Sequence, residues 1–300
     1  MREINRILCP IDLSDASRHA IEHAVMLARW YDAAITALHV HNPVGFPVPG
    51  LVAEGYGDPL PVVDADIRQL RDEVAACFDA ANVGDVDVNV VVESGLPTTW
   101  ILERAAALPA DLIVIGTHGV GGFQHLVLGS VAEKVLRKAT CPVLTVPPRA
   151  RATSRLPFKR LLCPVDFSES SLAALEAALS LAEEGDSELT ILHVLEWPVD
   201  DDVLATRPFS VPEYRRERER DAVAKLQGLV PDAVRAWCRP DTRLAHGKPY
   251  REILGVATED SSDLIVMGVH GRNALDLMLF GSTTNQVVRR ATCPVLTLRR

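Results

Sequence analysis

The sequence of 300 residues contains one long pattern twice, and this internal duplication constrains the fold more than any other feature. Residues 8–14 read LCPIDLS and return 154 positions later as LCPVDFS at 162–168. Residues 139–145 read ATCPVLT and return unchanged 152 positions later, at 291–297. A repeat unit of this length is a whole domain rather than one turn of a solenoid. The sequence therefore predicts a first domain at 1–148, a linker at 149–156 and a second domain at 157–300.

Each copy alternates short apolar segments with helical patterns. The apolar segments of the first copy are rich in Val and Ile and too short for helices, at residues 4–9, 33–40, 86–92, 112–115 and 143–146. Their nearly continuous apolar character is typical of parallel strands that are buried on both faces. Between them, residues 14–31 carry apolar side chains at helical spacing with Ser14 as candidate N-cap, and we expect further helices at 97–108 and 130–138. This alternation predicts an α/β fold with a doubly wound parallel sheet in each domain.

Two proline-containing segments, 42–63 and 196–212, precede the second helix of each copy. Their length is typical of functional or flexible loops rather than of core structure. After the second of these loops, residues 214–225 carry a run of Arg and Glu. That run predicts a helix with a solvated, charged face, and the alternative is a docking surface.

The composition disfavours several classes of protein. The net charge of −9 disfavours a general nucleic-acid binder, which needs a positive surface. No apolar stretch approaches the roughly 18–20 residues that span a bilayer, and we expect no signal peptide at the first residues. Six cysteines are too few for a disulfide scaffold, and we expect buried free thiols at the four that precede prolines: Cys9, Cys141, Cys163 and Cys293. Together these features predict a protein of the reducing cytoplasm.

Glycine and serine residues recur at identical spacing after the fourth strand of each copy. The pattern Gly-x2-Gly-x9-Gly-Ser comprises Gly116, Gly119, Gly129 and Ser130 in the first copy and Gly268, Gly271, Gly281 and Ser282 in the second. Glycines let a backbone approach phosphate oxygens or adopt positive φ, and a helix N-terminus offers unpaired N–H groups and a favourable dipole. Doubly wound sheets bind ligands at the carboxyl ends of their strands. The spacing therefore predicts a polyphosphate site; the alternative is that these glycines only shape a turn.

One carboxylate follows the first strand of each copy, at Asp12 and Asp166. Both lie at the same edge of the predicted sheet as the glycines. There a carboxylate can accept hydrogen bonds from a base amine or a ribose hydroxyl. The alternative is that it caps the N-terminus of the following helix, and the two roles can coexist.

These motifs together resemble the universal stress protein family in its tandem, ATP-binding form. The resemblance covers essentially the whole chain, twice. It implies two Rossmann-like domains of the adenine nucleotide alpha hydrolase-like kind, each a five-stranded parallel sheet of order 3-2-1-4-5 flanked by helices. It also implies pairing through the last strand, so that the two halves form an intramolecular pseudo-dimer and the chain forms a homodimer.

The resemblance also assigns a nucleotide-binding role to individual residues. It implies that Asp12 and Asp166 contact the adenine and that the backbone of Val40 and Val194 lines its pocket. Ribose and phosphates are then held by Gly116, Gly119, Gly129, Ser130 and Val131 in the first half, and by Gly268, Gly271, Gly281, Ser282 and Thr283 in the second. Arg272 adds a phosphate partner where the first half has Val120, so we expect the two sites to differ. Mg²⁺ bridges the phosphates in this scheme, and no carboxylate cluster predicts a separate metal site.

The resemblance implies a nucleotide-dependent sensor or regulator of the stress response. No phosphate loop, nucleophile elbow or recognisable catalytic triad predicts a dedicated enzyme. Two alternatives remain open. The first is a slow ATPase or self-phosphorylating protein that uses Ser130, Ser282 or Thr283 as acceptor. The second is an interaction module that binds a regulatory protein partner through the loops at 42–63 and 196–212, with ATP as a structural ligand.

Histidines occur in two further patterns, one that matches a metal-binding motif and one that recurs in both copies. His19, Glu22 and His23 match the H-x-x-E-H pattern of a group of zinc peptidases, but the second copy has Ala173 and Ala177 instead of the histidines. We therefore expect exposed histidines there and no metal. His39 recurs as His193 near the end of a strand, and we expect both to be structural or to line the pocket.

Overall fold

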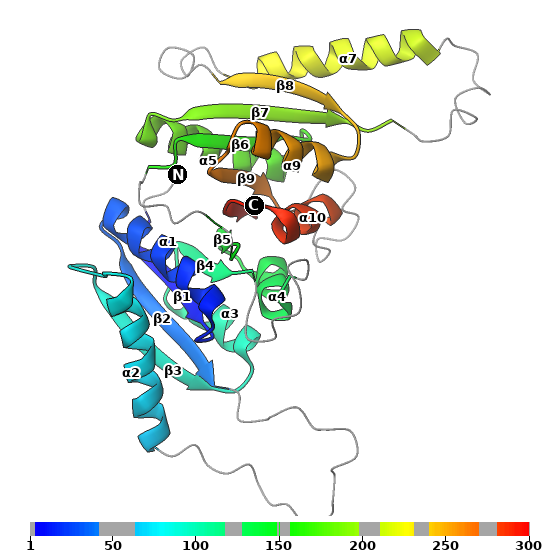
Figure 1. The fold of residues 1–300 in the computed structure, drawn as a ribbon. Helices are drawn as coiled ribbons and strands as arrows, with labels where there is room; N and C mark the ends of the chain where they lie inside the picture. The colour runs from blue at the N-terminus through cyan, green and yellow to red at the C-terminus, as the bar shows by residue number, and fades with distance from the viewer. Residues whose placement is uncertain are drawn as a thin grey trace, which may run out of the picture. The chain divides into compact units, whose positions relative to one another are not determined.

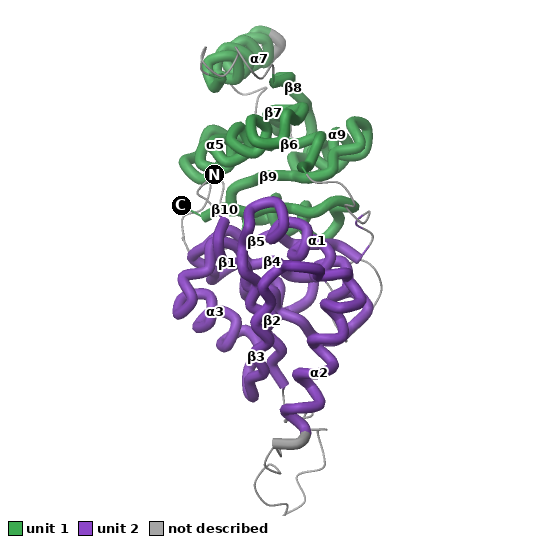
Figure 2. Tube along the Cα trace, turned by 90° about the vertical axis from the view of Figure 1, so that its left-hand side faces the viewer, with its two compact units in different colours: residues 1, 155–300 green, residues 2–154 purple. Residues whose placement is uncertain are grey.

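The computed structural model describes residues 4–41, 64–117, 128–148, 150, 157–197, 211–230, 240–269 and 281–299. The chain divides into two compact units, residues 2–154 and residues 155–300 with residue 1, which Figure 2 colours purple and green.

The first unit follows the predicted alternation of strands and helices (Figure 1). In chain order its elements are β1 (Arg6–Ile11), α1 (Asp15–Tyr31), β2 (Ala34–His41), α2 (Asp64–Ala80), β3 (Val88–Ser94), α3 (Pro97–Ala107), β4 (Leu112–Gly116), α4 (Ser130–Lys138) and β5 (Val143–Val146). The strands are parallel and lie in the order β3-β2-β1-β4-β5. Helix α1 packs beside α2 and α3 beside α4, so the helices cover the sheet in pairs.

The second unit repeats this topology. Its elements are β6 (Arg160–Pro164), α5 (Glu169–Gly185), β7 (Glu188–Leu195), α7 (Val211–Gly228), β8 (Asp241–His246), α9 (Pro249–Glu259), β9 (Leu264–Gly268), α10 (Ser282–Arg290) and β10 (Val295–Leu298). Its strands are also parallel, in the order β8-β7-β6-β9-β10. Both units therefore have the Rossmann-like order 3-2-1-4-5 that the resemblance implied.

Burial explains why the central strands read as continuous apolar segments. In β1 every residue after Arg6 is buried, and β5 is buried throughout. The edge strand β3 is only half-buried, and its bounds are Val88–Ser94 instead of the predicted 86–92. Its register is set by pairing with β2, from Ile35 opposite Val88 to His41 opposite Ser94, rather than by its own apolar residues.

The structure describes the predicted charged helix but most of neither predicted loop. Residues 42–63 and 198–210 lie outside the described residues. The charged run at 214–225 does form a helix, but α7 already begins at Val211, inside the segment predicted as a loop. Among the described residues, no helix is both long and apolar enough to cross a membrane.

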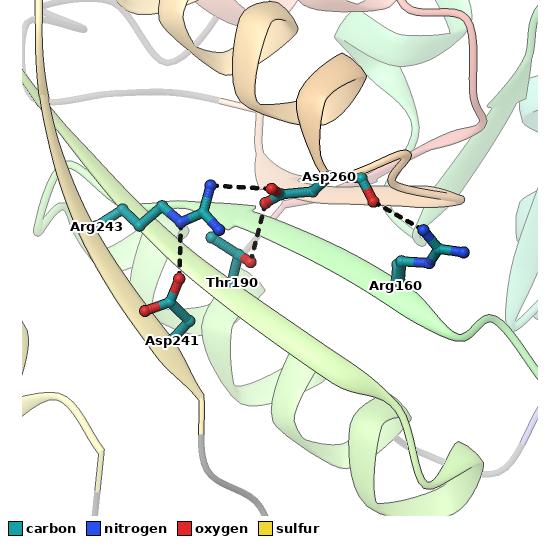
Figure 3. A network of polar contacts seen from close by, with 5 residues as sticks. All are labelled: Arg160, Thr190, Asp241, Arg243 and Asp260. Carbon is teal, nitrogen blue, oxygen red and sulfur yellow. Dashed lines mark hydrogen bonds and ion pairs between the residues drawn. The ribbon is translucent and has the colours of Figure 1, made fainter.

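A polar network fastens the amino-terminal edge of the second sheet (Figure 3). The guanidinium of Arg243 in β8 donates to Asp241 Oδ2 at 2.7 Å and to Asp260 Oδ1 at 2.9 Å. The hydroxyl of Thr190 in β7 donates to Asp260 Oδ2 at 3.3 Å. The guanidinium of Arg160, at the start of β6, donates to the backbone carbonyl oxygen of Asp260 at 3.2 Å. Asp260 follows α9, so this network joins that helix to three strands at the edge opposite the predicted ligand site.

Candidate functional sites

The strand order of each unit reverses between its first and fourth strands. Strand β1 pairs with β2 over six residues but with β4 over only two, Ile7 with Leu112 and Leu8 with Ile113. In the second unit β6 and β9 also pair over only two residues each. The neighbouring strands thus leave their hydrogen-bonded ladder before their carboxyl ends. This is the topological switch point at which doubly wound sheets bind ligands.

Asp12 lies at this edge, directly after β1, and its side chain is half-buried. Its Oδ1 accepts hydrogen bonds from the Ser14 N–H at 3.1 Å, from the Ser14 hydroxyl at 2.6 Å and from the Ser17 hydroxyl. In the second unit Asp166 Oδ1 accepts from the N–H of Ser168 at 3.0 Å and from its hydroxyl at 2.5 Å. Both carboxylates therefore fix the turn that leads into the following helix. A contact with adenine stays a prediction.

The residue after each of these aspartates has a left-handed backbone. Leu13 has φ 61° and Phe167 has φ 64°. A non-glycine residue in this region costs on the order of 1–3 kcal/mol and persists only where the surroundings hold it. Here the hydrogen bonds of Asp12 and Asp166 hold it. The sequence does not predict this strain, because nothing in a Leu or a Phe indicates positive φ.

The repeated histidines His39 and His193 are buried and support the same turns. The Nδ1 atom of His39 lies 2.9 Å from the carbonyl oxygen of Ile11, and that of His193 lies 2.7 Å from the carbonyl oxygen of Val165. A carbonyl oxygen only accepts, so Nδ1 carries the proton in both residues. The structural role predicted for this pair is confirmed.

The predicted phosphate-binding helices begin beside the fourth strand of each unit. Gly129 precedes α4, and its N–H donates to the carbonyl oxygen of Thr117 at 2.8 Å. Gly281 precedes α10, and its N–H donates to the carbonyl oxygen of Val269 at 3.1 Å. These bonds bring the end of β4 and the start of α4 together, as they do for β9 and α10.

The backbone angles of Gly129 and Gly281 do not require glycine. Gly129 has φ −57° and Gly281 has φ −56°, which any residue adopts. Positive φ is therefore not the reason for glycine at either position. What remains is the missing side chain, which leaves the first turn of each helix open, and no side chain caps either helix.

Most other predicted site residues lie at the same edge of their unit. Gly116 ends β4, Val40 and Val194 lie near the ends of β2 and β7, and all three are half-buried. The first residues of α4 and α10 are exposed serines followed by a half-buried residue, as Ser130 with Val131 and Ser282 with Thr283. Gly119, Gly271 and Arg272 lie outside the described residues.

Gly268 has a packing role that the sequence did not predict. It is buried at the end of β9, against Ser170 in the first turn of α5. Packing between a strand and a helix thus requires a residue without a side chain at this position, and a contact with the nucleotide stays a prediction.

The two histidines of the zinc-peptidase pattern differ in burial and in their partners. His19 Nδ1 lies 3.2 Å from Glu22 Oε2, whereas His23 is only 1% exposed and its Nδ1 lies 2.7 Å from the carbonyl oxygen of His19. The expectation of two exposed histidines is therefore wrong for His23. Its burial lowers the pKa of the imidazole. The described part of the chain contains no group of three or more His, Cys, Asp or Glu that could hold a metal ion.

Comparisons with known proteins agree with this architecture. The model of the universal stress protein family matches residues 3–147 and again residues 157–299. A universal stress protein of Mycolicibacterium smegmatis is 28% identical over 303 residues, which cover 98% of this chain and 96% of that protein. A universal stress protein of Bacillus subtilis is 35% identical over 147 residues, which cover 47% of this chain and 99% of that protein.

Solved structures show the same relationship. The crystal structure of a universal stress protein from Archaeoglobus fulgidus has a TM-score of 0.64 and 25% identity, with 99% of both chains covered. Since the family model matches both halves, the chain belongs to the universal stress protein family and carries two copies of the family domain in tandem.

Proposed function

We propose that each unit binds ATP at the carboxyl edge of its sheet and that the bound nucleotide regulates what the protein does in a stress response. The observation that carries this proposal is the repeated arrangement at the switch point. In both units a carboxylate follows the first strand, and an uncapped helix begins beside the end of the fourth strand.

The residues present support binding of a nucleotide, and the choice of adenine rests on the resemblance to the family. The first N–H groups of α4 and α10 have no partner within the helix and lie at its positive end, which suits phosphate oxygens. The exposed hydroxyls of Ser130 and Ser282 add donors at the same place. In this proposal Asp12 and Asp166 accept from the base or the ribose while they keep their turns in place. Bound Mg²⁺ would neutralise phosphate charge, held by the nucleotide itself.

The test replaces the glycine before each helix with a larger residue. Gly129→Leu and Gly281→Leu are compatible with the observed φ, so the fold should survive while the new side chain blocks the helix N-terminus. Titration calorimetry with Mg-ATP should show about two sites in the wild type, one in each single variant and none in the double variant. Unchanged ATP affinity in the double variant would overturn the site assignment.

Regulation is tested separately from binding. If the nucleotide acts as a signal, hydrogen exchange of the protein should change on addition of Mg-ATP beyond the residues that contact it, and the change should vanish in the double variant. The proposal includes a homodimer, for which light scattering should give twice the mass of one chain. Binding without any change outside the sites would favour ATP as a structural ligand.

A second candidate function is self-phosphorylation, because Ser130 and Ser282 are exposed at the first position of their helices. The serine Oγ would take the γ-phosphoryl group of ATP, with loss of its proton to solvent and departure of ADP. Mass spectrometry after incubation with Mg-ATP would show added phosphate on these residues. Absence of both added phosphate and ADP would eliminate this candidate.

A further inference from the structure

A cluster of cations lies around Tyr250 at the start of α9, and none of its members is assigned to the nucleotide. The Nε–H of Arg251 donates to the Tyr250 hydroxyl at 3.1 Å. The guanidinium carbons of Arg251 and Arg290 lie 5.9 Å and 5.2 Å from the centre of the Tyr250 ring. Arg290 comes from the last turn of α10, which packs against α9, and Lys248 is the N-cap of α9. Lys248, Arg251 and Arg290 are exposed.

The charges in this cluster oppose the usual preference of a helix N-terminus. The first turn of an α-helix favours carboxylates, because its free N–H groups carry partial positive charge. Here Lys248 and Arg251 occupy the N-cap and the first turn of α9, and Glu252, the acidic residue of that turn, lies against Gly247. Such a local conflict is expected where a sequence serves a purpose other than stability.

The cations also lack the partners that arginines have elsewhere in the same unit. Arg243 binds two carboxylates, those of Asp241 and Asp260. Among the described residues, none of Lys248, Arg251 and Arg290 forms an ion pair with a carboxylate. These three cations lie together in a chain whose net charge is −9. The Arg251 hydrogen bond and the charges of Arg290 and Lys248 lower the pKa of the Tyr250 hydroxyl.

The first unit does not need such a cluster to build the same fold. Helix α3 begins at Pro97 as α9 begins at Pro249, so Lys248, Tyr250, Arg251 and Arg290 correspond to Leu96, Thr98, Thr99 and Lys138. Leu96 is 67% exposed, and neither threonine carries a charge. The cluster is therefore a property of the second unit alone.

We propose that Lys248, Tyr250, Arg251 and Arg290 form a docking surface for an acidic segment of a partner protein. Arginine and tyrosine are enriched among the residues that dominate binding energy at protein interfaces, and guanidinium groups match carboxylates in shape. A long polyanion such as nucleic acid would be repelled by the acidic remainder of the chain, whereas two or three carboxylates contact only the cluster. A net-acidic protein thus recognises an acidic partner through one local patch.

The experiment uses the full chain and a fluorescent hexaglutamate peptide as probe, with hexaglutamine as neutral control. The wild type should bind hexaglutamate with an affinity that falls as salt rises. Arg251→Gln with Arg290→Gln should weaken binding at least about tenfold, since hydrogen bonds to charged groups are the stronger kind. Lys138→Gln, the matched change in the first unit, should leave the affinity unchanged.

Two further readouts separate the outcomes. The double variant should keep its ATP stoichiometry, which shows that it is folded and that the surface is independent of the nucleotide sites. Hexaglutamate should also raise the pH at which the Tyr250 phenolate absorbs, measured as the difference from Tyr250→Phe. The proposal would be overturned if wild type and double variant bound hexaglutamate with equal affinity, or if Lys138→Gln lost as much affinity as the double variant. It would also be overturned if the arginines were needed only for binding to a DNA oligonucleotide or to anionic vesicles.

Discussion

The backbone of Ser170 occupies the space that a side chain on Gly268 would need. A Cβ atom at Gly268 would lie 2.7 Å from Ser170 Oγ, 2.8 Å from its carbonyl carbon and 2.9 Å from its carbonyl oxygen. Two of these three atoms belong to the backbone, which cannot move aside as a flexible side chain can. The glycine at the end of β9 therefore allows helix α5 to begin close to the sheet.

Replacing Gly268 with alanine should therefore destabilise the second unit. Overpacking of this kind costs about 1–3 kcal/mol of unfolding free energy, which urea-induced unfolding would measure. Gly255→Ala in α9 is the matched control, because no atom lies within 4 Å of its Cβ position. That change should stabilise the chain by about 0.5–1 kcal/mol through helix propensity. Similar effects of the two substitutions would contradict the packing argument.

The serines that precede α1 and α5 should contribute unequally to stability. Ser168 Oγ accepts a hydrogen bond from the Ser171 N–H at 3.3 Å, whereas Ser14, at the predicted N-cap position, makes no side-chain cap. Both serines donate to the preceding aspartate. Ser168→Ala should therefore cost about 0.5–1 kcal/mol more than Ser14→Ala, the difference being the cap itself. Urea-induced unfolding of the two variants, with hydrogen exchange to locate the change, would check this.

Two equivalent aspartates should respond to pH in opposite directions. Asp111 accepts from the N–H groups of Asn5 and Arg6 and from the Arg6 side chain; these bonds outweigh desolvation and lower its pKa. Asp263 accepts from the N–H groups of Lys159 and Arg160, but desolvation dominates there and raises its pKa.

The sign of each contribution follows from linkage. A carboxyl whose pKa is lowered by folding stabilises the fold at pH values above its pKa in the unfolded chain, which is near 4. This stabilisation is lost as the pH falls through the pKa of the same carboxyl in the folded protein. A carboxyl whose pKa is raised by folding stabilises the fold at pH values below its pKa in the unfolded chain. This stabilisation is lost as the pH rises through the pKa of the same carboxyl in the folded protein. Unfolding of Asp111→Asn and Asp263→Asn between about pH 3 and 7 should show these opposite trends relative to wild type. Parallel pH profiles would contradict the assignment.

The thiols that precede prolines should resist alkylation in the folded protein. Cys9, Cys163 and Cys293 are buried as expected, whereas Cys141 is only half-buried. Burial raises the pKa of Cys9 and Cys293 to about 12 and that of Cys141 to about 11, and it raises the pKa of Cys163 as well. Only the thiolate reacts, so iodoacetamide at pH 8 should modify these residues slowly, and rapidly in urea. Peptide mass spectrometry would give the rate for each cysteine. Fast labelling of Cys9 in the native protein would show that β1 is more accessible than its burial indicates.

Local sequence patterns predicted most of the fold because the information they carry is local. The strand at 143–146 and the helix at 130–138 have the predicted bounds, since an apolar run or a helical stripe is present within a few neighbouring residues. The duplication then fixed the topology of the second unit by that of the first. Asp12 and Asp166 were identified by the same means, because each directly follows a predicted strand.

What only the tertiary structure decided depends on residues that are distant in the chain. The close approach of Ser170 to Gly268 joins residues almost a hundred positions apart, and no local pattern predicts it. The burial of His23 and the position of Arg290 beside Tyr250 likewise arise from how helices pack. By itself the sequence determined the repeat and the alternation of strands and helices in each copy. The strand order came from the resemblance and is confirmed by the structure, whereas the ligand-binding edge stays a prediction. Packing decided which side chains meet there, because contact energies act between neighbours in space and not along the chain.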